Sequence, residues 1–508
     1  MNRLKYLSCI VITLVMGGSC SKSFTSITPT NNIYAADAIT SVENVRAAVN
    51  GLYYLMATSD YYGRTAVLLP DLMADNIYRS VQAGARFTSY ANQSVTSTDG
   101  YALSLWQQLY SIVINANTII NKYPAVPVKS SDSLEFRQLI GEAYAARALA
   151  YFDLTRFFAY SYTKMTDSTN FAVPIVLGSY PNDLSEVEYP ARSSTADCYA
   201  QIFRDKDSAL QYLNPNGNVL IKGAVDPSLF RIRLNYFSVN ALAARAYLYK
   251  GDYANAIQAA SIVIASPRYS LLPASTLTSD FHSQGNSESI FEIANNAYNN
   301  QGSNSIAYIF NQNGYGEMLA PDTMYNIYDT VDARRGFITP GRRNSFGGED
   351  STYIINKYSN ITNYQENIKI FRLAEMYLIR SEALALSSGV QSAIPDLITI
   401  TSARKEILKA DTSSKATLVT FMPTILLENR KEFAFEGHRI FDLTRIHDQT
   451  STRLTTTYAY YHYRYQTLTK GQIPRSGAMI STLKKYALLP IPNTDRKNNI
   501  ALTQNLGY

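Results

Sequence analysis

The chain is long, rich in tyrosine and nearly balanced in charge. It has 508 residues, of which 46% are hydrophobic and 17% are charged, and its formal net charge is +6. This composition is typical of a folded protein, and no interior stretch approaches the roughly 20 apolar residues that span a bilayer. Lys and Arg form no dense run that could neutralise phosphates, which argues against nucleic acid as a partner. The 40 tyrosines suit partly hydrated recognition surfaces, because each ring joins an apolar face to a polar tip.

The N-terminus has the layout of a secretory signal. Arg3 and Lys5 precede an apolar run, and the small residues Gly17 to Ser19 stand directly before Cys20. A charged start, a short apolar run and a small-residue cleavage point are typical of such signals. We therefore expect residues 1–19 to be removed by cleavage before Cys20. Small residues followed by a Cys also resemble a bacterial lipobox, in which that Cys becomes the lipidated first residue.

The residues after Cys20 indicate a tether and leave one further cysteine. Residues 20–34 are polar and rich in Ser, Thr and Asn, which predicts a flexible link between the lipid and the folded body. Once Cys20 is lipidated, Cys198 is the one cysteine left for other chemistry. It lies beside Tyr199 in a helical pattern, and we interpret it as a small core residue, not as a nucleophile.

Helical periodicity dominates the first half of the chain. Apolar residues recur at three- and four-residue spacing over 45–56, 103–120 and 141–158, as in helices with one buried face. Trp106 belongs to this pattern, so we interpret it as a core residue. Alanines on the third segment let a neighbouring helix approach closely. The pattern predicts a mostly α fold.

The stretch from 240 to 267 resembles the second half of a tetratricopeptide repeat. Two helical patterns flank a Gly-Asp-Tyr turn at 251–253, and Ala256 follows three residues later. A looser copy of the unit lies at 371–397. Such units bury their apolar faces by stacking on one another, so they predict a scaffold of helix pairs within a single domain, residues 35–508.

The composition changes between residues 266 and 364, which are rich in Asn, Ser, Gly and Tyr. Turn-forming residues at this density predict loops with short helices or strands. Loops that a rigid scaffold displays are common places for binding sites. We therefore divide the domain into a helical scaffold at about 35–265 and 365–446, a loop-rich, ligand-facing region at about 266–364, and an irregular C-terminal region at 447–508.

Several motifs resemble those of the SusD/RagB family. They are VPIV from Val173, PARSS from Pro190, FRLAEMYLIRSEA from Phe371, ENRKEFAFEGHRIFDLTR from Glu428, LPIP from Leu489 and LTQNLGY from Leu502. They follow one another in order over nearly the whole chain, which is far more specific than any single motif. The chain departs from the family pattern at Asn429, where an Arg is usual, and at Leu506, where a Pro is common.

This resemblance implies both a fold and a function. The implied fold is a mostly α, tetratricopeptide-like helix-pair scaffold with long loop-rich insertions. The implied function is that of a lipid-anchored outer-membrane protein that faces the exterior. It captures an oligosaccharide or a peptide and delivers it to a TonB-dependent, SusC-like transporter. The resemblance implies no enzyme and no cofactor, and the four scattered histidines have no metal-ligand spacing.

Two other functions stay open at the level of sequence. Glu428, Glu432 and Glu436 stand four residues apart on one helical face, and carboxylates ~5 to 6 Å apart suit a retaining glycosidase. The same segment carries Arg430, Lys431, Arg439, Asp442 and Arg445. Because Arg439 lies three residues after Glu436, we favour an ion-pair network over a hydrolase. A structural or adhesive surface lipoprotein is the second alternative, which the Tyr- and Asn-rich loops disfavour.

Two loops form the predicted ligand site. One runs from Tyr78 to Tyr90 and the other from Asn295 to Tyr315, and both combine aromatic faces with amide or guanidinium donors. The candidate ligand residues are Tyr78, Arg79, Phe87, Tyr90, Asn295, Tyr298, Tyr308 and Tyr315. In the resembled family, ligand contacts come from comparable loops.

A rival tyrosine cluster lies near the C-terminus. It comprises Tyr458, Tyr460, Tyr461, Tyr463 and Tyr465. The alternation of these residues is also what an ordinary strand or a transporter-facing surface would show. We therefore favour the two loops and keep this cluster as the alternative site.

Replacing the lipidated cysteine tests the anchor. We expect Cys20→Ala protein to fold but to leave the membrane fraction, because the mature chain has no other long apolar segment that could hold it there. Fractionation of washed membranes measures this, with Ser21→Ala as the matched control that stays bound. Cys20→Ala protein that remains on membranes cleared of any transporter would contradict lipidation at this residue.

Overall fold

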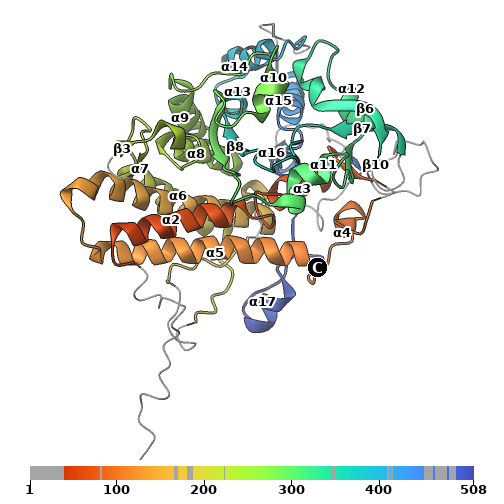
Figure 1. Cartoon of the computed structure of the whole chain (residues 1–508). Helices are drawn as coiled ribbons and strands as arrows, with labels where there is room; N and C mark the ends of the chain where they lie inside the picture. The colour runs from red at the N-terminus through yellow and green to blue at the C-terminus, as the bar shows by residue number, and fades with distance from the viewer. Residues whose placement is uncertain are drawn as a thin grey trace, which may run out of the picture.

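Helices make up most of the protein, as the periodicity predicts (Figure 1). The structure is a computed structural model. It describes residues 39–80, 83–164, 170–179, 187–221, 224–344, 349–408, 412–413, 416–450, 461–463, 477–479 and 488–508. The predicted signal and tether, with Cys20, lie outside the described residues, as do Tyr458, Tyr460 and Tyr465. Within the described ranges, no helix is long and apolar enough to cross a membrane.

Four long helices pack against one another in chain order. They are α2 (Val42–Ala57), α5 (Gly100–Lys122), α6 (Ser133–Phe158) and α7 (Thr195–Tyr212). In Figure 1, α2 and α5 lie side by side along the lower part of the molecule. A side-chain oxygen of Ser41, Asp99 or Ser194 accepts a backbone N–H in the first turn of α2, α5 and α7, which stabilises each start. Trp106 on α5 is 4% exposed, which confirms it as a core residue.

Two stacked helix pairs confirm the tetratricopeptide-like pattern. The elements are α8 (Tyr236–Lys250), α9 (Tyr253–Ile264), α13 (Leu373–Ser387), α14 (Val390–Ala403) and the adjoining α15 (Leu418–Glu432). Gly251 ends α8 with a left-handed φ of 81°, a conformation that glycine adopts without steric cost. Asp252 then caps α9. Because α13 packs on α8, α9, α14 and α15, the pairs form one continuous scaffold.

Residues 266–364 contain short elements that build outward from this scaffold. They are α10 (Leu277–His282), β4 (Ser289–Ile293), α11 (Ile306–Phe310), β5 (Met318–Ala320), α12 (Asp322–Asn326), β6 (Ile338–Arg343) and β7 (Glu349–Ile355). β4 pairs with β8 (Ile368–Arg372), which leads directly into α13. A second antiparallel sheet has the order β1-β5-β7-β6, where β1 is Tyr78–Arg79. That sheet joins the first predicted loop to the loop-rich region.

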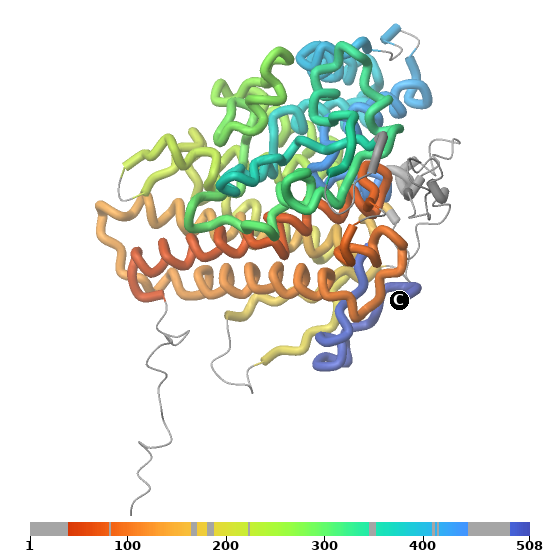
Figure 2. The backbone as a smooth tube through the Cα atoms, turned by 45° about the vertical axis from the view of Figure 1, so that its right-hand side comes forward, coloured from red at the N-terminus to blue at the C-terminus, as the bar shows by residue number. Residues whose placement is uncertain are grey.

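The C-terminal segment packs under one end of the long helices. Figure 2 shows residues 488–508, in blue, beneath the start of α5. The backbone N–H of Leu489 donates to the carbonyl of Phe157 (2.7 Å), and that of Asn493 donates to Ser97 (2.8 Å). The remaining helices and strands are α3 (Thr65–Leu72), α4 (Thr88–Ala91), β2 (Leu220–Ile221), β3 (Ala224–Val225), α16 (Arg439–Thr450), β9 (Tyr461–Tyr463), β10 (Gly477–Met479) and α17 (Asn493–Asn498).

An ion-pair network surrounds the three glutamates that the sequence places on one helical face. Glu432 at the end of α15 forms ion pairs with Arg404 at 2.8 Å, Arg372 at 2.9 Å and Arg334 at 3.1 Å. Burial opposes ionisation of Glu432, but Arg404 and Arg372 outweigh it and hold the pKa of its carboxyl well below its usual range. The network is therefore a buried, charged contact that fixes the fold.

The partners in this network differ from those that the sequence predicts. Arg439 does not pair with Glu436 three residues earlier; its Nε donates to Asp75 at 2.6 Å. Glu436 pairs instead with Arg372 at 2.7 Å and Lys357 at 2.5 Å. The local prediction is wrong because Arg439 begins a new helix, α16, beyond the left-handed Gly437. α15 itself ends at Glu432 and Phe435 is left-handed, so Glu436 stands in this turn and the three glutamates do not share one helical face as the sequence predicts.

Removing Glu432 tests whether the network holds the fold. We expect Glu432→Ala to lower the free energy of unfolding by about 3 to 5 kcal/mol, because it leaves three buried guanidinium groups with fewer counter-charges. Urea denaturation measures the change. Asp207→Ala is the control. The Asp207 side chain is 65% exposed, so its ion pair with Lys206 should contribute about 0 to 1 kcal/mol to stability. Equal losses in both variants would contradict the structural role.

Removing Arg439 tests its revised partner. We expect Arg439→Ala to cost about 1 to 4 kcal/mol, because Asp75 is 6% exposed and loses its closest ion pair, while the contact with Arg430 at 3.2 Å remains. Thermal denaturation beside the exposed-arginine variant Arg137→Ala measures the difference. If Arg439→Ala melts like the wild type and yet loses ligand binding, the residue is functional and the structural interpretation fails.

Candidate functional site

Strand pairing brings parts of the two predicted loops together. Tyr78 of β1 lies opposite Leu319 of β5 in the sheet. The backbone N–H of Ser80 donates to the carbonyl of Glu317 at 2.8 Å, and that of Gly84 donates to its carboxylate at 3.2 Å. Residues 78–80, 83–86 and 315–319 therefore pack together, although more than 200 residues separate the two segments in the sequence.

Arg86 and three tyrosines form a cluster where these segments meet. The Arg86 guanidinium lies 3.5 Å from the ring centroid of Tyr315 and donates to Glu317 at 2.7 Å. Tyr308 meets Tyr315 edge to face at 4.7 Å, and Tyr364 lies 6.1 Å from Tyr308. All four side chains are half-buried. We call Arg86, Tyr308, Tyr315 and Tyr364 the Arg86 cluster.

The sequence singles out two members of this cluster, Tyr308 and Tyr315, as ligand residues and misses the role of Tyr364. Tyr364 stands among turn-forming residues and has a left-handed φ of 57°, which is uncommon for a residue with a side chain. Its position in an Asn-rich turn near the end of the loop region is the signal that could have identified it. Tyr364 also lines a small cavity with Gly63 and Asn295, so it connects the cluster to the neighbouring loop.

The other predicted residues of the first loop are buried and support it from beneath. Tyr78 packs on Leu319, and Arg79 donates to the carbonyls of Ala83 and Arg86. Phe87 and Tyr90 are each 1% exposed. Phe87 stacks on Tyr101 at 4.1 Å, and the Tyr90 hydroxyl donates to Asp99 at 2.6 Å. In this structure these four side chains position the loop and offer a ligand little surface.

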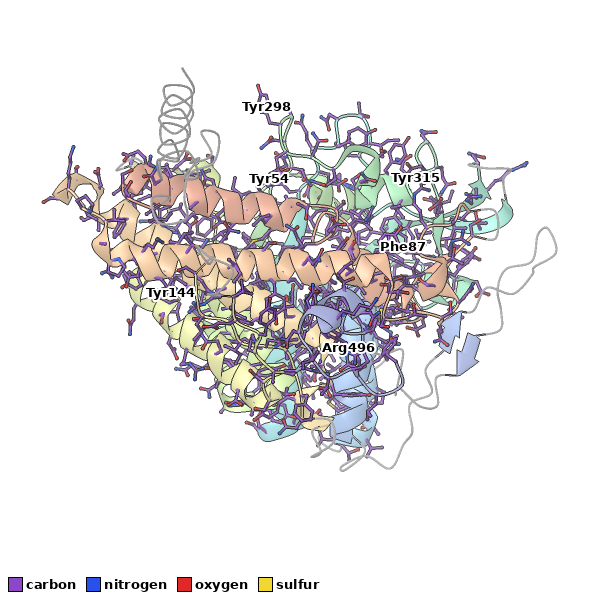
Figure 3. The ribbon with its side chains drawn as sticks, turned by 90° about the horizontal axis from the view of Figure 1, so that it is seen from below. Tyr54, Phe87, Tyr144, Tyr298, Tyr315 and Arg496 are labelled. Carbon is purple, nitrogen blue, oxygen red and sulfur yellow. The ribbon has the colours of Figure 1, made fainter. Side chains whose placement is uncertain are left out.

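The second loop divides into two parts that face different neighbours. Asn295 is buried and donates to the carbonyl of Glu366 at 2.8 Å. Tyr298 is fully exposed, on a turn that the Asn296 side chain holds. Figure 3 shows Tyr298 near Tyr54 of α2 and apart from Tyr315. Tyr298 and Tyr315 therefore serve separate parts of the candidate surface.

A pocket lies beside the part that carries Tyr298. It has a volume of about 340 Å³ and is lined by Asn50, Tyr53, Tyr54, Leu229, Ile232, Arg233, Ile293, Ala294, Asn296 and Asn299. At its base Arg233 pairs with Glu142 at 2.6 Å, and the Tyr53 hydroxyl donates to the same carboxylate at 2.7 Å. The charges cancel there, so the pocket offers amides and tyrosine rings to a neutral polar group.

The glutamates that suggest a hydrolase cannot reach a substrate in this structure. Glu428, Glu432 and Glu436 are 1%, 3% and 9% exposed, respectively. Burial raises the pKa of Glu428 to about 8, but Arg334 contacts this carboxyl in the interior. The three carboxylates therefore belong to the fold.

Cys198 and the described acidic residues add no further chemistry. Cys198 is fully buried, and burial raises the pKa of its thiol to about 11, so the thiolate that a nucleophile needs is scarce at neutral pH. This confirms the interpretation of Cys198 as a core residue. In the described part of the chain, no group of three or more His, Cys, Asp or Glu residues is arranged to hold a metal ion.

Comparison with known proteins gives the same family over both halves of the chain. The SusD family profile matches residues 292–508, and a SusD-like profile described as starch-binding and associating with the outer membrane matches residues 30–249. A SusD-like protein of Formosa agariphila is 24% identical over 455 residues, which cover 79% of this chain and 83% of that protein. A second one from the same organism is 23% identical and covers 88% and 92%.

Solved structures share the fold. A SusD superfamily protein from Bacteroides vulgatus has a TM-score of 0.76 at 26% identity, covering 92% of this chain and all of that one. A laminarin-binding SusD-like protein has a TM-score of 0.68 at 20% identity, covering 92% and 100%. At the lower identity the likeness describes the fold alone.

Proposed function

The chain belongs to the SusD/RagB family, and from that membership we propose that it binds a nutrient glycan at the outer membrane and passes it to a transporter. The observation that carries the proposal is the Arg86 cluster, in which half-buried tyrosine rings and a guanidinium from three separate segments lie together. Similar proteins support the proposal. One matching profile is described as starch-binding and associating with the outer membrane, and one structural neighbour is described as laminarin-binding.

The chemistry of the surface suits a sugar. A tyrosine ring can stack on the apolar face of a pyranose, while amide and guanidinium groups bond its hydroxyls. The Arg86 cluster and the pocket beside Tyr298 offer both kinds of group. Amides bond a peptide backbone equally well, so a peptide is the second candidate ligand, and binding measurements must include both classes.

Delivery rests on the family and on the N-terminal motif. Lipid attachment at Cys20 would hold the protein on the outer membrane, facing the exterior, where a TonB-dependent, SusC-like transporter could receive the ligand. Co-purification of the full chain with a SusC-like transporter from the same organism tests this step. Recovery of a well-folded protein that never associates with that transporter, under conditions in which ligand binds, would remove delivery from the proposal.

Intact recovery of bound glycan separates binding from hydrolysis. We expect oligosaccharides from starch and laminarin to bind and to elute unchanged in length, because the helical carboxylates are buried in ion pairs. Chromatography of the products after prolonged incubation measures this. Shortened products that persist in a Glu432→Gln variant would point to a hydrolytic site elsewhere, and self-association without any ligand would favour an adhesive protein.

Two tyrosine substitutions test the predicted site. We expect Tyr298→Ala and Tyr315→Ala each to weaken binding by about 1 to 3 kcal/mol if the ring is an anchor, with little change in melting temperature. Calorimetry measures the affinities, and Tyr189→Ala, at a position that is 58% exposed outside the two loops, is the matched control.

A different set of affinities is expected if the ligand binds at the rival C-terminal tyrosine cluster. Wild-type affinity for both loop variants, together with weaker binding after Tyr461→Ala or Tyr463→Ala, would move the site to that cluster. A loss on Tyr315→Ala alone would restrict the site to the Arg86 cluster and exclude the pocket beside Tyr298.

A further inference from the structure

Arg64 is a buried cation with no described carboxylate at hydrogen-bonding distance. It lies between α2 and α3 and is 7% exposed. Its Nε is buried without a hydrogen-bond partner, and its guanidinium donates no hydrogen bond within the described part of the chain. The nearest carboxylate, that of Asp60, is 3.8 Å away and 43% exposed. This distance is too long for a charge-assisted hydrogen bond.

Three other buried arginines each donate two hydrogen bonds to a carboxylate. Arg147 donates to Asp205 at 2.9 Å and 2.5 Å, and Arg233 donates to Glu142 at 3.0 Å and 2.6 Å. Arg445 likewise makes two contacts with Glu382. Burying a guanidinium is unfavourable unless an anion or several acceptors replace its water. The scaffold meets this condition at those three positions and leaves it unmet at Arg64.

Apart from the distant Asp60 carboxylate, the described surroundings of Arg64 consist largely of aromatic rings. Its guanidinium carbon lies 5.3 Å from the ring centroid of Phe87 and 5.5 Å from that of Tyr101. Burial lowers the pKa of Arg64; Tyr101 and Asp60 offset part of this effect, and the positive charge of Arg86 adds to it. The charge of Arg86 itself is met by Glu317, whose carboxylate is fully buried. Of these two arginines, Arg64 is therefore the one without a carboxylate at hydrogen-bonding distance.

Arg64 also stands at the edge of the Arg86 cluster. It interacts electrostatically with Tyr315 and Arg86, and the carbonyl of the preceding Gly63 accepts the N–H of Ile306 at 3.0 Å. That bond fixes the start of α11, which carries Tyr308. The terminal nitrogens of Arg64 are not among the buried unpaired atoms, so the small exposed part of this side chain includes donors.

We propose that Arg64 recognises an anionic group on an acidic sugar residue of the ligand, with Arg86 and Tyr315 beside it. The inference rests on the proposed function, because it assigns a ligand class to the same surface. A guanidinium presents two parallel N–H groups, the arrangement that a carboxylate or a sulfate ester accepts in bidentate form. Uronic acids and sulfated sugars share this chemistry, and the test distinguishes them.

The test compares three oligosaccharides of equal length on the full chain by calorimetry: a uronate, a sulfate ester and a neutral glucan. We expect the wild type to bind one acidic probe at least about tenfold more tightly than the neutral one, and Arg64→Gln to lose that preference. Arg64→Lys should keep part of it, because Lys retains the charge without the planar fork. Arg137→Gln, an exposed arginine elsewhere, is the matched control and should bind as the wild type does.

The two ways of failing are distinct. Equal affinity for acidic and neutral probes, unchanged in Arg64→Gln, would overturn the anionic ligand and leave glycan binding in place. Absence of binding to all three probes by a folded protein would overturn both proposals.

Melting temperatures of two variants test the proposal without a ligand. We expect Arg64→Met to keep or raise the melting temperature, because it removes an unpaired buried charge, whereas Arg147→Met, which breaks a paired one, should lower it. If Arg64→Met lowers the melting temperature as much as Arg147→Met does, Arg64 is structural and the proposal fails.

Discussion

Glu432 accepts ion pairs from three arginines that come from separate parts of the chain, and the position of the loop-rich region depends on this contact. Arg404 follows α14, Arg372 ends β8, and Arg334 belongs to the insertion itself. Since a buried charge tolerates little displacement of its partners, the network fixes the insertion against the helix pairs. A binding surface on short elements becomes rigid in this way without a large core of its own.

The two small sheets extend that fixed point toward the surface. β8 runs from the network and pairs with β4, so Asn295, just beyond β4, is held close to the scaffold. β5 pairs with β1, so Arg86 reaches Tyr315 although the two residues belong to distant segments. Backbone pairing supplies the register, and buried aromatic rings such as Phe87 support the loop from below. The candidate site therefore consists of loops whose positions are set by strands.

Local patterns in the sequence predicted the scaffold, and tertiary contacts decided the rest. The helix pair around Gly251 was predictable because periodicity and a left-handed turn are properties of neighbouring residues. The glutamates were rightly assigned to ion pairs, but the arginines that bind Glu432 are 28 to 98 residues away in sequence. Phe87 and Tyr298 look alike in a polar loop, yet one is buried against Tyr101 and the other fully exposed. Only the fold distinguishes them.

Charge burial separates the structural arginines from the functional candidate. A scaffold that places carboxylates at hydrogen-bonding distance from Arg147, Arg233 and Arg372 shows that it can neutralise a buried guanidinium. Leaving Arg64 without such a partner makes the unbound state less stable than it could be. Departures from local consistency of this kind are expected where a residue serves a ligand and not the fold. On the proposed function, a ligand anion that approaches Arg64 more closely than Asp60 does would gain affinity from a cation already held in place.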